Sequence, residues 1–292
     1  MKDIIAIQGA QGSNHHKVAL AVYGKDVLVR ECPSFDSVVE HLLHKTANGG
    51  IMALENTIAG SIIPNYALID QNNLQICGEY YLNIHHHLMA LHGQKIEDIT
   101  EVCSHPMALL QCKQFLKKHS YIKLVEDVDT AEVAKRISEQ QVRGVAAIAP
   151  KIAAELFGLE VLEDEIQTIK NNATRFVIVQ KREVPTTLNR TDKQNTAEDI
   201  NKASLKFELN HKRGSLAAVL NVLSDCKLNM TKIQSLPKIA TPWKYAFFVD
   251  VTFEDYKDYA RAKTIIDIMA LEFKILGEYK NARATILREA AI

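Results

Sequence analysis

Short apolar segments alternate with longer amphipathic segments along the first part of the chain, and this alternation limits the fold most strongly. Ile4 to Gln8 has the pattern of a strand, Asn14 to Tyr23 has the spacing of a helix, and Val27 to Glu31 has the pattern of a second strand. Strands separated by crossover helices build the sheet of an α/β protein. In open sheets of this class, ligands bind beyond the carboxyl ends of the strands.

The same pattern continues as far as the apolar segment from Arg175 to Val179. Further strands are expected at 51–54, 74–81, 85–91, 123–125 and 145–149, and further helices at 35–46, 64–70, 106–119 and 131–140. This order predicts two sheet-containing lobes, with the chain crossing between them more than once. A ligand cleft would then lie at the interface of the lobes.

The composition changes after Gln180, where a polar segment with few large apolar residues is typical of a linker. Beyond it, strands are expected at 205–209, 230–236, 245–251 and 273–279, and helices at 215–226 and 262–271. The resulting order, βαββαβ, is the ferredoxin-like arrangement. We therefore predict a two-lobed domain at 1–180, a linker at 181–201, a second domain at 202–281 and a tail at 282–292.

The bulk composition excludes several classes of partner. A chain of 292 residues with 47% hydrophobic residues can form two domains, each with its own core. Lys+Arg and Asp+Glu each number 35, so no overall positive field favours nucleic acid or an acidic membrane. No segment approaches the ~20 apolar residues that span a bilayer, and the N-terminal apolar run is shorter than a signal-peptide core. We expect a cytoplasmic protein that binds neither nucleic acid nor membrane.

The cysteine and histidine patterns favour neither a disulfide framework nor a metal site. The 5 cysteines are scattered and lack paired spacing, so we interpret them as reduced packing residues. The run His85-His86-His87 would place His86 on the opposite face of a strand from its neighbours, which leaves too few ligands for a metal. No metal and no cofactor are expected.

Several short motifs occur in a fixed order along the chain, and together they are more specific than any one of them. The strongest is Asn171-Asn172-Ala173-Thr174-Arg175-Phe176. The others are Glu55-Asn56-Thr57 followed by Gly60, Ser104-His105-Pro106 with Gln111-Cys112, Asp129-Thr130-Ala131, and Ala146-Ala147-Ile148-Ala149. Over nearly the whole chain these motifs resemble those of bacterial prephenate dehydratases that carry a C-terminal ACT domain. One departure is Asp129, which stands where that family usually has serine.

This resemblance implies a periplasmic-binding-protein-like catalytic domain of two lobes, followed by an ACT regulatory domain. The implied reaction converts prephenate to phenylpyruvate, water and carbon dioxide in phenylalanine biosynthesis, without a cofactor. Two alternatives stay open from the sequence. One is arogenate dehydratase, whose substrate carries an amino group in place of the keto group. The other is a non-catalytic two-lobed protein that binds small anions.

The resemblance also indicates site residues. The implied catalytic residues are Thr174, Arg175, Asn172, Glu55, Asn56 and Thr57, and the implied substrate-binding residues are Ser13, Thr130 and Phe176. The Thr174 hydroxyl could donate to the departing oxygen, and the Arg175 guanidinium suits a carboxylate. Neighbouring strand residues face opposite ways, so both line one cleft only if the chain turns at Thr174. Ser13 and Thr130 lie near predicted helix starts, where they either cap the helix or help to bind an anion.

The second domain has two motifs that resemble the effector-binding segments of ACT domains. Gly214-Ser215-Leu216-Ala217 is similar to a Gly-Ala-Leu-Val motif at the start of the first helix. Gln234-Ser235-Leu236-Pro237 stands where Glu-Ser-Arg-Pro is usual, so both charges are lost while Ser235 persists. The resemblance implies that phenylalanine binds across the interface of a homodimer or homotetramer and inhibits the enzyme. If binding depended on the lost charges, this domain would only hold subunits together.

Overall fold

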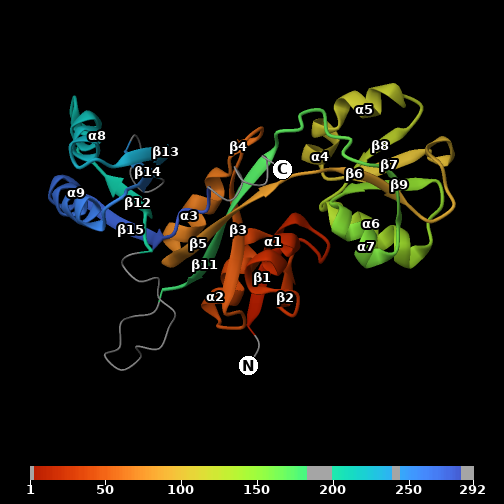
Figure 1. Cartoon of the computed structure of the whole chain (residues 1–292), viewed down its shortest axis with the longest axis horizontal. Coiled ribbons are helices and arrows are strands. Elements are labelled where there is room, and N and C mark those ends of the chain that lie inside the picture. Colours follow the sequence, from red (N-terminus) through yellow and green to blue (C-terminus); the bar gives the residue numbers. More distant parts are fainter. Residues whose placement is uncertain (1–2, 183–198, 239–243, 284–292) are drawn as a thin grey trace. The chain divides into compact units, whose positions relative to one another are not determined.

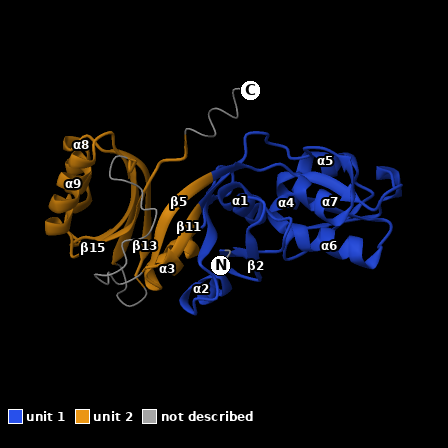
Figure 2. Ribbon diagram, turned by 60° about the horizontal axis from the view of Figure 1, so that its bottom comes forward, with its two compact units in different colours: residues 1–62, 81–176 blue, residues 63–80, 177–292 orange. Residues whose placement is uncertain are grey.

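The computed structural model describes residues 3–182, 199–238 and 244–283 (Figure 1). The chain forms two compact units, residues 1–62 with 81–176 and residues 63–80 with 177–292 (Figure 2). Two of the three boundaries fall inside strands β5 (Leu74–Asn83) and β11 (Ala173–Lys181), so each of these strands contributes to both units. The domain division at residue 180 stays a prediction. Most of the predicted linker and tail lies outside the described residues.

The first sheet has 6 strands in the order β2-β1-β3-β11-β5, with β4 paired to β3. Strand β1 pairs in parallel with both β2 and β3, which confirms the α/β pattern expected from the sequence. The remaining elements of this part are β1 (Ile4–Gln8), β2 (Leu28–Cys32), β3 (Gly49–Asn56), β4 (Gly60–Ser61), α1 (Asn14–Tyr23), α2 (Phe35–Leu43) and α3 (Ile63–Gln71). Strand β3 continues beyond the predicted end because Glu55 and Asn56 pair with β4.

The second sheet, within residues 81–176, has 5 strands in the order β10-β6-β9-β7-β8. Its strands are β6 (His87–Ala90), β7 (Glu101–Ser104), β8 (Lys123–Glu126), β9 (Val145–Ala149) and β10 (Glu160–Glu163). Its helices are η1 (Ile96–Asp98), α4 (Pro106–Gln111), α5 (Lys113–Lys118), α6 (Thr130–Gln140) and α7 (Lys151–Phe157). Helices cover both faces, since Ala147 and Ala149 of β9 belong to one apolar cluster while Ala146 and Ile148 belong to another.

The sequence prediction was wrong at several places in this sheet. The single helix expected at 106–119 is two helices, separated at Cys112, whose ψ of 13° leaves the helical range. Strands β7 and β10 and helix α7 were not predicted. Each is short, at 4, 4 and 7 residues, and too short for its periodicity to stand out in the sequence.

The C-terminal sheet is antiparallel with the order β13-β14-β12-β15. Its elements are β12 (Lys202–Glu208), α8 (Ser215–Asp225), β13 (Asn229–Pro237), β14 (Tyr245–Thr252), α9 (Tyr256–Met269) and β15 (Glu272–Tyr279). This confirms the predicted βαββαβ order and the ferredoxin-like fold. Helix α9 begins earlier than expected because the Asp255 side chain caps it and Tyr259 is fully buried.

Strand β12 has two buried faces of opposite character. Ala203, Leu205 and Phe207 belong to the apolar cluster that also contains residues of α8 and α9. The alternate residues Lys202, Ser204, Lys206 and Glu208 are polar and equally buried. A sheet face lined with buried charges must be covered by partners of opposite charge.

None of the helices in the described part of the chain is both long enough and apolar enough to cross a membrane.

Helix α1 contributes a buried histidine to the core beside β11. The His15 ring lies 5.0 Å from the Phe176 ring and 5.5 Å from the Phe35 ring, measured between centroids, with edge-to-face geometry. Its Nε2 is buried, and no described residue forms a hydrogen bond with it. Burial lowers the pKa of His15 from its ordinary value of 6.5 to about 4. The folded protein therefore holds this ring neutral.

His15 should make the fold sensitive to acid. Between its unfolded pKa of 6.5 and its folded pKa of about 4, the unfolded chain binds a proton that the folded protein does not. The free energy of unfolding should therefore fall as the pH is lowered through this window. His15→Leu should remove part of that fall, measured by urea unfolding at about pH 7.5 and about pH 5. An equal fall in both proteins would contradict this role of His15.

Candidate active site

The end of strand β3 and the start of strand β11 are joined through Thr57. Its backbone N–H donates to the carbonyl of Ala173 over 2.9 Å, and its hydroxyl Oγ1 accepts from the Ala173 N–H over 2.9 Å. Thr57 thus satisfies both backbone groups of Ala173. This pairing places the side chains of Asn56 and Thr174 beside each other.

The backbone fixes the orientation of the Asn56 amide. Its Oδ1 accepts the N–H groups of Ile58 and Ala59 at 2.9 and 2.8 Å, so its Nδ2 must face the other way. That nitrogen donates to Thr174 Oγ1 at 2.9 Å and to Asn172 Oδ1 at 2.7 Å. Asn172 Oδ1 accepts this hydrogen bond, so the Nδ2 group of Asn172 can donate to another acceptor.

The network continues away from Thr174 through Asn172. Asn172 Nδ2 donates to Gln111 Oε1 at 2.9 Å, and the same oxygen lies 2.8 Å from His86 Nε2. The Gln111 oxygen can only accept, so His86 carries its proton on Nε2. Its Nδ1 is buried without a hydrogen-bond partner among the described residues, and burial lowers the pKa of His86. His86 is therefore a neutral donor.

This chain of amides leaves the Thr174 hydroxyl able to donate. Thr174 is buried, and the hydrogen bonds of the described residues use Oγ1 only as an acceptor, from Asn56. Its hydrogen can therefore point to a bound molecule. A hydroxyl that accepts one hydrogen bond is polarised and becomes a better donor for the next. The arrangement suits stabilisation of an oxygen that gains negative charge.

Strand β11 runs without interruption through Thr174 and Arg175, so the turn at Thr174 considered above is absent. Alternation places the two side chains on opposite faces of the strand. Phe176 shares the face of Thr174 and packs against His15. Arg175 is only 3% exposed, so its guanidinium lies inside the protein.

The other predicted residues lie at helix starts and on a strand. Ser13 is the N-cap of α1, with its side chain accepting from the His16 N–H at 3.3 Å. Thr130 is the first residue of α6, whose cap is Asp129. Glu55 lies in β3, opposite Ser61. No hydrogen bond among the described residues joins Ser13 or Thr130 to the Thr174 network.

Asp129 joins the start of α6 to the segment that follows β1, a role that the sequence did not indicate. One carboxylate oxygen accepts the N–H groups of Ala131 and Glu132 at 2.9 and 3.0 Å, and the carboxylate also accepts the N–H of Ala10. A β-carbon on Gly9, whose φ is +86°, would lie 2.5 Å from the second oxygen. Gly9 therefore has to be glycine. Burial raises the pKa of Asp129.

A cavity of about 390 Å³ lies beside the segment that carries the histidine run. Its lining includes Lys17, His85, His87, Asp164 and Glu165. His85 Nδ1 lies 3.1 Å from Glu165 Oε1, and His87 Nδ1 lies 2.9 Å from Asp164 Oδ1. These two rings face the cavity, whereas the ring of His86 faces Gln111. The described residues contain no group of three or more His, Cys, Asp and Glu side chains that could hold a metal ion.

The sequence matches known proteins over most of its length. The family model described as prephenate dehydratase matches residues 5–184. The chain belongs to the prephenate dehydratase family. A curated relative in this family is arogenate dehydratase/prephenate dehydratase 2 of Arabidopsis thaliana, a chloroplastic protein. It is 32% identical over 285 residues, which cover 94% of this chain and 72% of the relative.

Two solved structures are similar to almost the whole chain. Prephenate dehydratase from Arthrobacter aurescens in complex with L-Phe has a TM-score of 0.82 at 22% identity, covering 99% of this chain and 97% of that chain. It supports the fold alone. GqqA, described as a novel type of quorum quenching acylase, has a TM-score of 0.83 at 26% identity, covering 97% of this chain and 99% of that chain.

Two members of the network, Gln111 and His86, were not predicted from the sequence. Gln111 belongs to a matched motif but was not chosen as a site residue, and its motif was the only available signal. His86 was interpreted as a packing or surface residue within a histidine run. Only the fold shows that its Nε2 reaches Gln111.

Asn56→Asp should separate the two roles of this amide. Aspartate can still accept both backbone N–H groups, so the turn should persist, but it cannot donate to Thr174 or Asn172. We expect dehydratase turnover to fall by about 100-fold, the order of effect seen when one such donor is lost. Asn72→Asp is the control, because the Asn72 amide donates to the Leu68 carbonyl and to no other described residue. Steady-state kinetics with near-normal turnover of Asn56→Asp would refute the network.

Proposed function

We propose that this member of the prephenate dehydratase family converts prephenate to phenylpyruvate, water and carbon dioxide at the Thr174 site. The observation that supports the proposal is the hydrogen bond of the Thr174 hydroxyl. Its oxygen accepts from Asn56 Nδ2, so its hydrogen can be donated to the substrate. The residues that orient this hydrogen bond are neutral amides held by backbone groups. They need no rearrangement when charge develops on the departing oxygen.

The reaction requires two bonds to break. The bond from the ring to its carboxylate breaks, and that electron pair enters the ring as carbon dioxide leaves. The bond from the ring to its hydroxyl breaks in turn, the ring becomes aromatic, and the departing hydroxide becomes water by net uptake of one proton from the solvent. The two negative charges of prephenate and this proton balance the single charge of phenylpyruvate. Thr174 donates a hydrogen bond to that oxygen and does not have to lose its own proton. A donor of this kind contributes about 3 kcal/mol.

The carboxylates of the substrate are proposed to lie at the starts of α1 and α6. Each helix begins just beyond the end of a strand, where the helix dipole favours an anion. At α6 a substrate carboxylate would lie beside the Asp129 carboxylate, which already accepts the N–H groups of Ala131 and Glu132. Ser13 and Thr130 are the predicted contacts there. Arg175 is proposed to act with them by fixing β11 from its opposite face, because it is buried on that side. Replacing it should therefore reduce stability as well as substrate binding.

Two other reactions serve as comparisons. Arogenate is the alternative substrate, as the name of the Arabidopsis thaliana relative suggests, and parallel assays with both compounds would separate the two. An acylase activity, suggested by the name of GqqA, needs a nucleophile with an adjacent base. Among the described residues, the hydrogen-bond partner of the Thr174 hydroxyl is the side-chain amide Nδ2 of Asn56, which is a donor and not a base. The site therefore favours dehydration.

The test of Thr174 uses two substitutions of similar shape. Thr174→Val removes the hydroxyl and should lower kcat for prephenate by about 100-fold or more while changing KM little. Thr174→Ser keeps the hydroxyl and should retain activity within about tenfold of the wild type. Phenylpyruvate formation by the folded variants measures both. A Thr174→Val enzyme with wild-type kcat would remove Thr174 from the mechanism.

We also propose phenylalanine as an effector of the C-terminal domain. Gly214 adopts a left-handed conformation, with φ of 81°, directly before α8, and no side chain caps the helix start. The Ser215 N–H donates to the Lys212 carbonyl, whereas the hydrogen bonds of the described residues leave the N–H groups of Leu216 and Ala217 for a carboxylate. Ser235 is exposed on β13, at the edge of the sheet, where a second copy of the chain would complete the site. We therefore propose a homo-oligomer in which phenylalanine binds between subunits and inhibits.

Gly214→Val should weaken phenylalanine binding by at least about tenfold, since its side chain would cover the helix start while the backbone is strained. Gly93→Val is the matched control. Gly93 also has a positive φ, 73°, and no heavy atom lies within 4 Å of the added β-carbon. Calorimetric titration and inhibition assays should respond only to the Gly214 change. Wild-type protein that shows neither heat nor inhibition at millimolar phenylalanine would defeat the effector proposal but not the catalytic one.

A further inference from the structure

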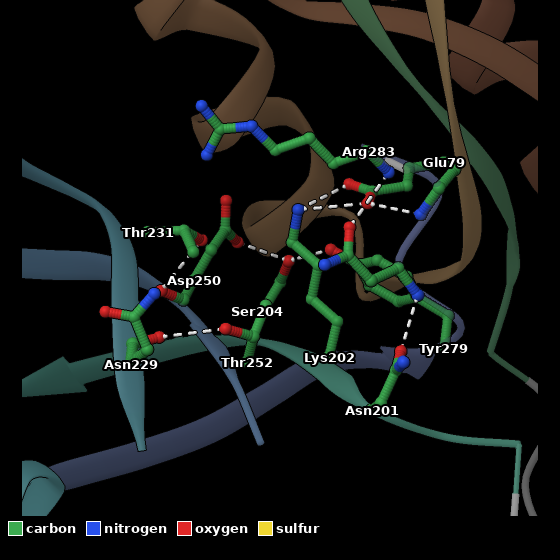
Figure 3. A network of polar contacts seen from close by, with 12 residues as sticks. Glu79, Asn201, Lys202, Ser204, Asn229, Thr231, Asp250, Thr252, Tyr279 and Arg283 are labelled. Atoms are coloured by element: carbon green, nitrogen blue, oxygen red, sulfur yellow. Dashed lines mark hydrogen bonds and ion pairs between the residues drawn. The ribbon is translucent and has the colours of Figure 1, made fainter. Parts of the chain in front are cut away.

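A buried ion pair joins the polar face of the C-terminal sheet to strand β5. Lys202 Nζ lies 2.7 and 3.0 Å from the two carboxylate oxygens of Glu79 (Figure 3). The two side chains are 2% and 0% exposed. Glu79 Oε1 also accepts the N–H of Ala282 at 3.1 Å. Burial of two charges is costly, and loss of either partner would leave the other charge unpaired.

A second cluster fixes the same sheet to the end of α3. The Asp70 carboxylate lies 2.9 Å from Lys206 Nζ and 2.9 Å from Lys274 Nζ, and Lys274 also donates to the Asp70 carbonyl at 2.8 Å. Close by in the same unit, the Tyr66 and Phe248 rings are in edge contact, with centroids 5.5 Å apart. The polar face of β12 is therefore covered by α3 and β5 of the same chain.

Gly277 of β15 allows the two backbones to approach closely. A β-carbon at this position would overlap the carbonyl oxygen of Ile76 in β5. The ion pairs thus lie beside a backbone contact between β15 and β5 that is very close. Even a methyl group at Gly277 would force these strands apart.

Strand β5 leads directly from this contact to the catalytic network. Beyond Glu79 the strand ends at Asn83, and the N–H of the next residue, Ile84, donates to the carbonyl of Asn172 over 2.7 Å. Asn172 is the residue that connects Asn56 with Gln111. The strand that carries Glu79 therefore leads, one residue beyond its end, to the backbone hydrogen bond that holds Asn172.

We propose that Glu79 and Lys202 are positioning residues for the dehydratase site, coupling the C-terminal sheet through β5 to the placement of Asn172 and Thr174. This inference rests on the function proposed above. The effect of the ion pair passes along strand β5 to Ile84, whose N–H group donates to the carbonyl of Asn172. Loss of the pair should disturb the alignment of Thr174 more than the affinity for substrate.

Two independent changes in the full-length chain test the coupling. Glu79→Gln combined with Lys202→Gln removes both charges at once, so that neither is left buried alone. Gly277→Ala leaves both charges and separates the strands instead. The matched controls are Asp199→Asn with Lys280→Gln, an exposed pair of the same unit at 3.5 Å, and Gly78→Ala, whose added β-carbon would meet Ile178 at an ordinary 3.5 Å.

The measurements are kcat and KM for prephenate, and hydrogen exchange of the Ile84 amide. Both test variants should lose at least about tenfold in kcat with KM within about threefold. Ile84 should exchange at least about tenfold faster in both. The control variants should match the wild type in all three quantities. Measurements are made well below the unfolding midpoint of each variant, so that global unfolding does not contribute.

Wild-type kcat and wild-type Ile84 exchange in a folded test variant would overturn the coupling, and either variant suffices if the other fails to fold. A wild-type chain that turns over neither prephenate nor arogenate would instead refute the proposed function. In that case the exchange of Ile84 alone decides whether the C-terminal sheet positions the Asn172 segment.

Discussion

The orientation of the Asn56 side-chain amide determines the direction of the hydrogen bonds that connect Thr174 with His86 in the candidate site. Two backbone N–H groups bind its oxygen, so its nitrogen has to face Thr174 and Asn172. Each later bond follows from this one, through Gln111 to the proton on His86. The network contains no charged group. It can therefore be buried at modest cost and still present a directed hydroxyl to the substrate.

The C-terminal sheet shows the opposite solution, in which full charges are buried. Lys202 and Lys206 lie on the polar face of β12, and carboxylates from β5 and α3 neutralise them. Ion pairs of this kind add little stability over a well-packed apolar contact, but they penalise any other alignment strongly. The consequence here is a specific register between the sheet and β5, which the close approach of Gly277 to Ile76 reinforces.

Much of the candidate site could be predicted from the sequence, except where residues meet partners that are far away along the chain. Asn56, Thr57, Asn172 and Thr174 were all identified from motifs, and the fold brings these four together. Gln111 and His86 were missed, because nothing local distinguishes an amide or imidazole that meets a partner far away in the sequence. The turn considered at Thr174 was wrong. The residues on both sides of Thr174 belong to strand β11. The chain bends before this strand, where the Asn172 N–H donates to the carbonyl of Lys170.

The sequence by itself determined the α/β class, the βαββαβ order and most strand and helix positions, because these depend on periodicities that are local. It also carried the motifs that identify the family. The tertiary structure alone decided which face of β11 each side chain takes, the division of the chain through β5 and β11, and the pairing of Glu79 with Lys202. These features depend on contacts between residues far apart in the chain, whose geometry is fixed only when the sheets pack.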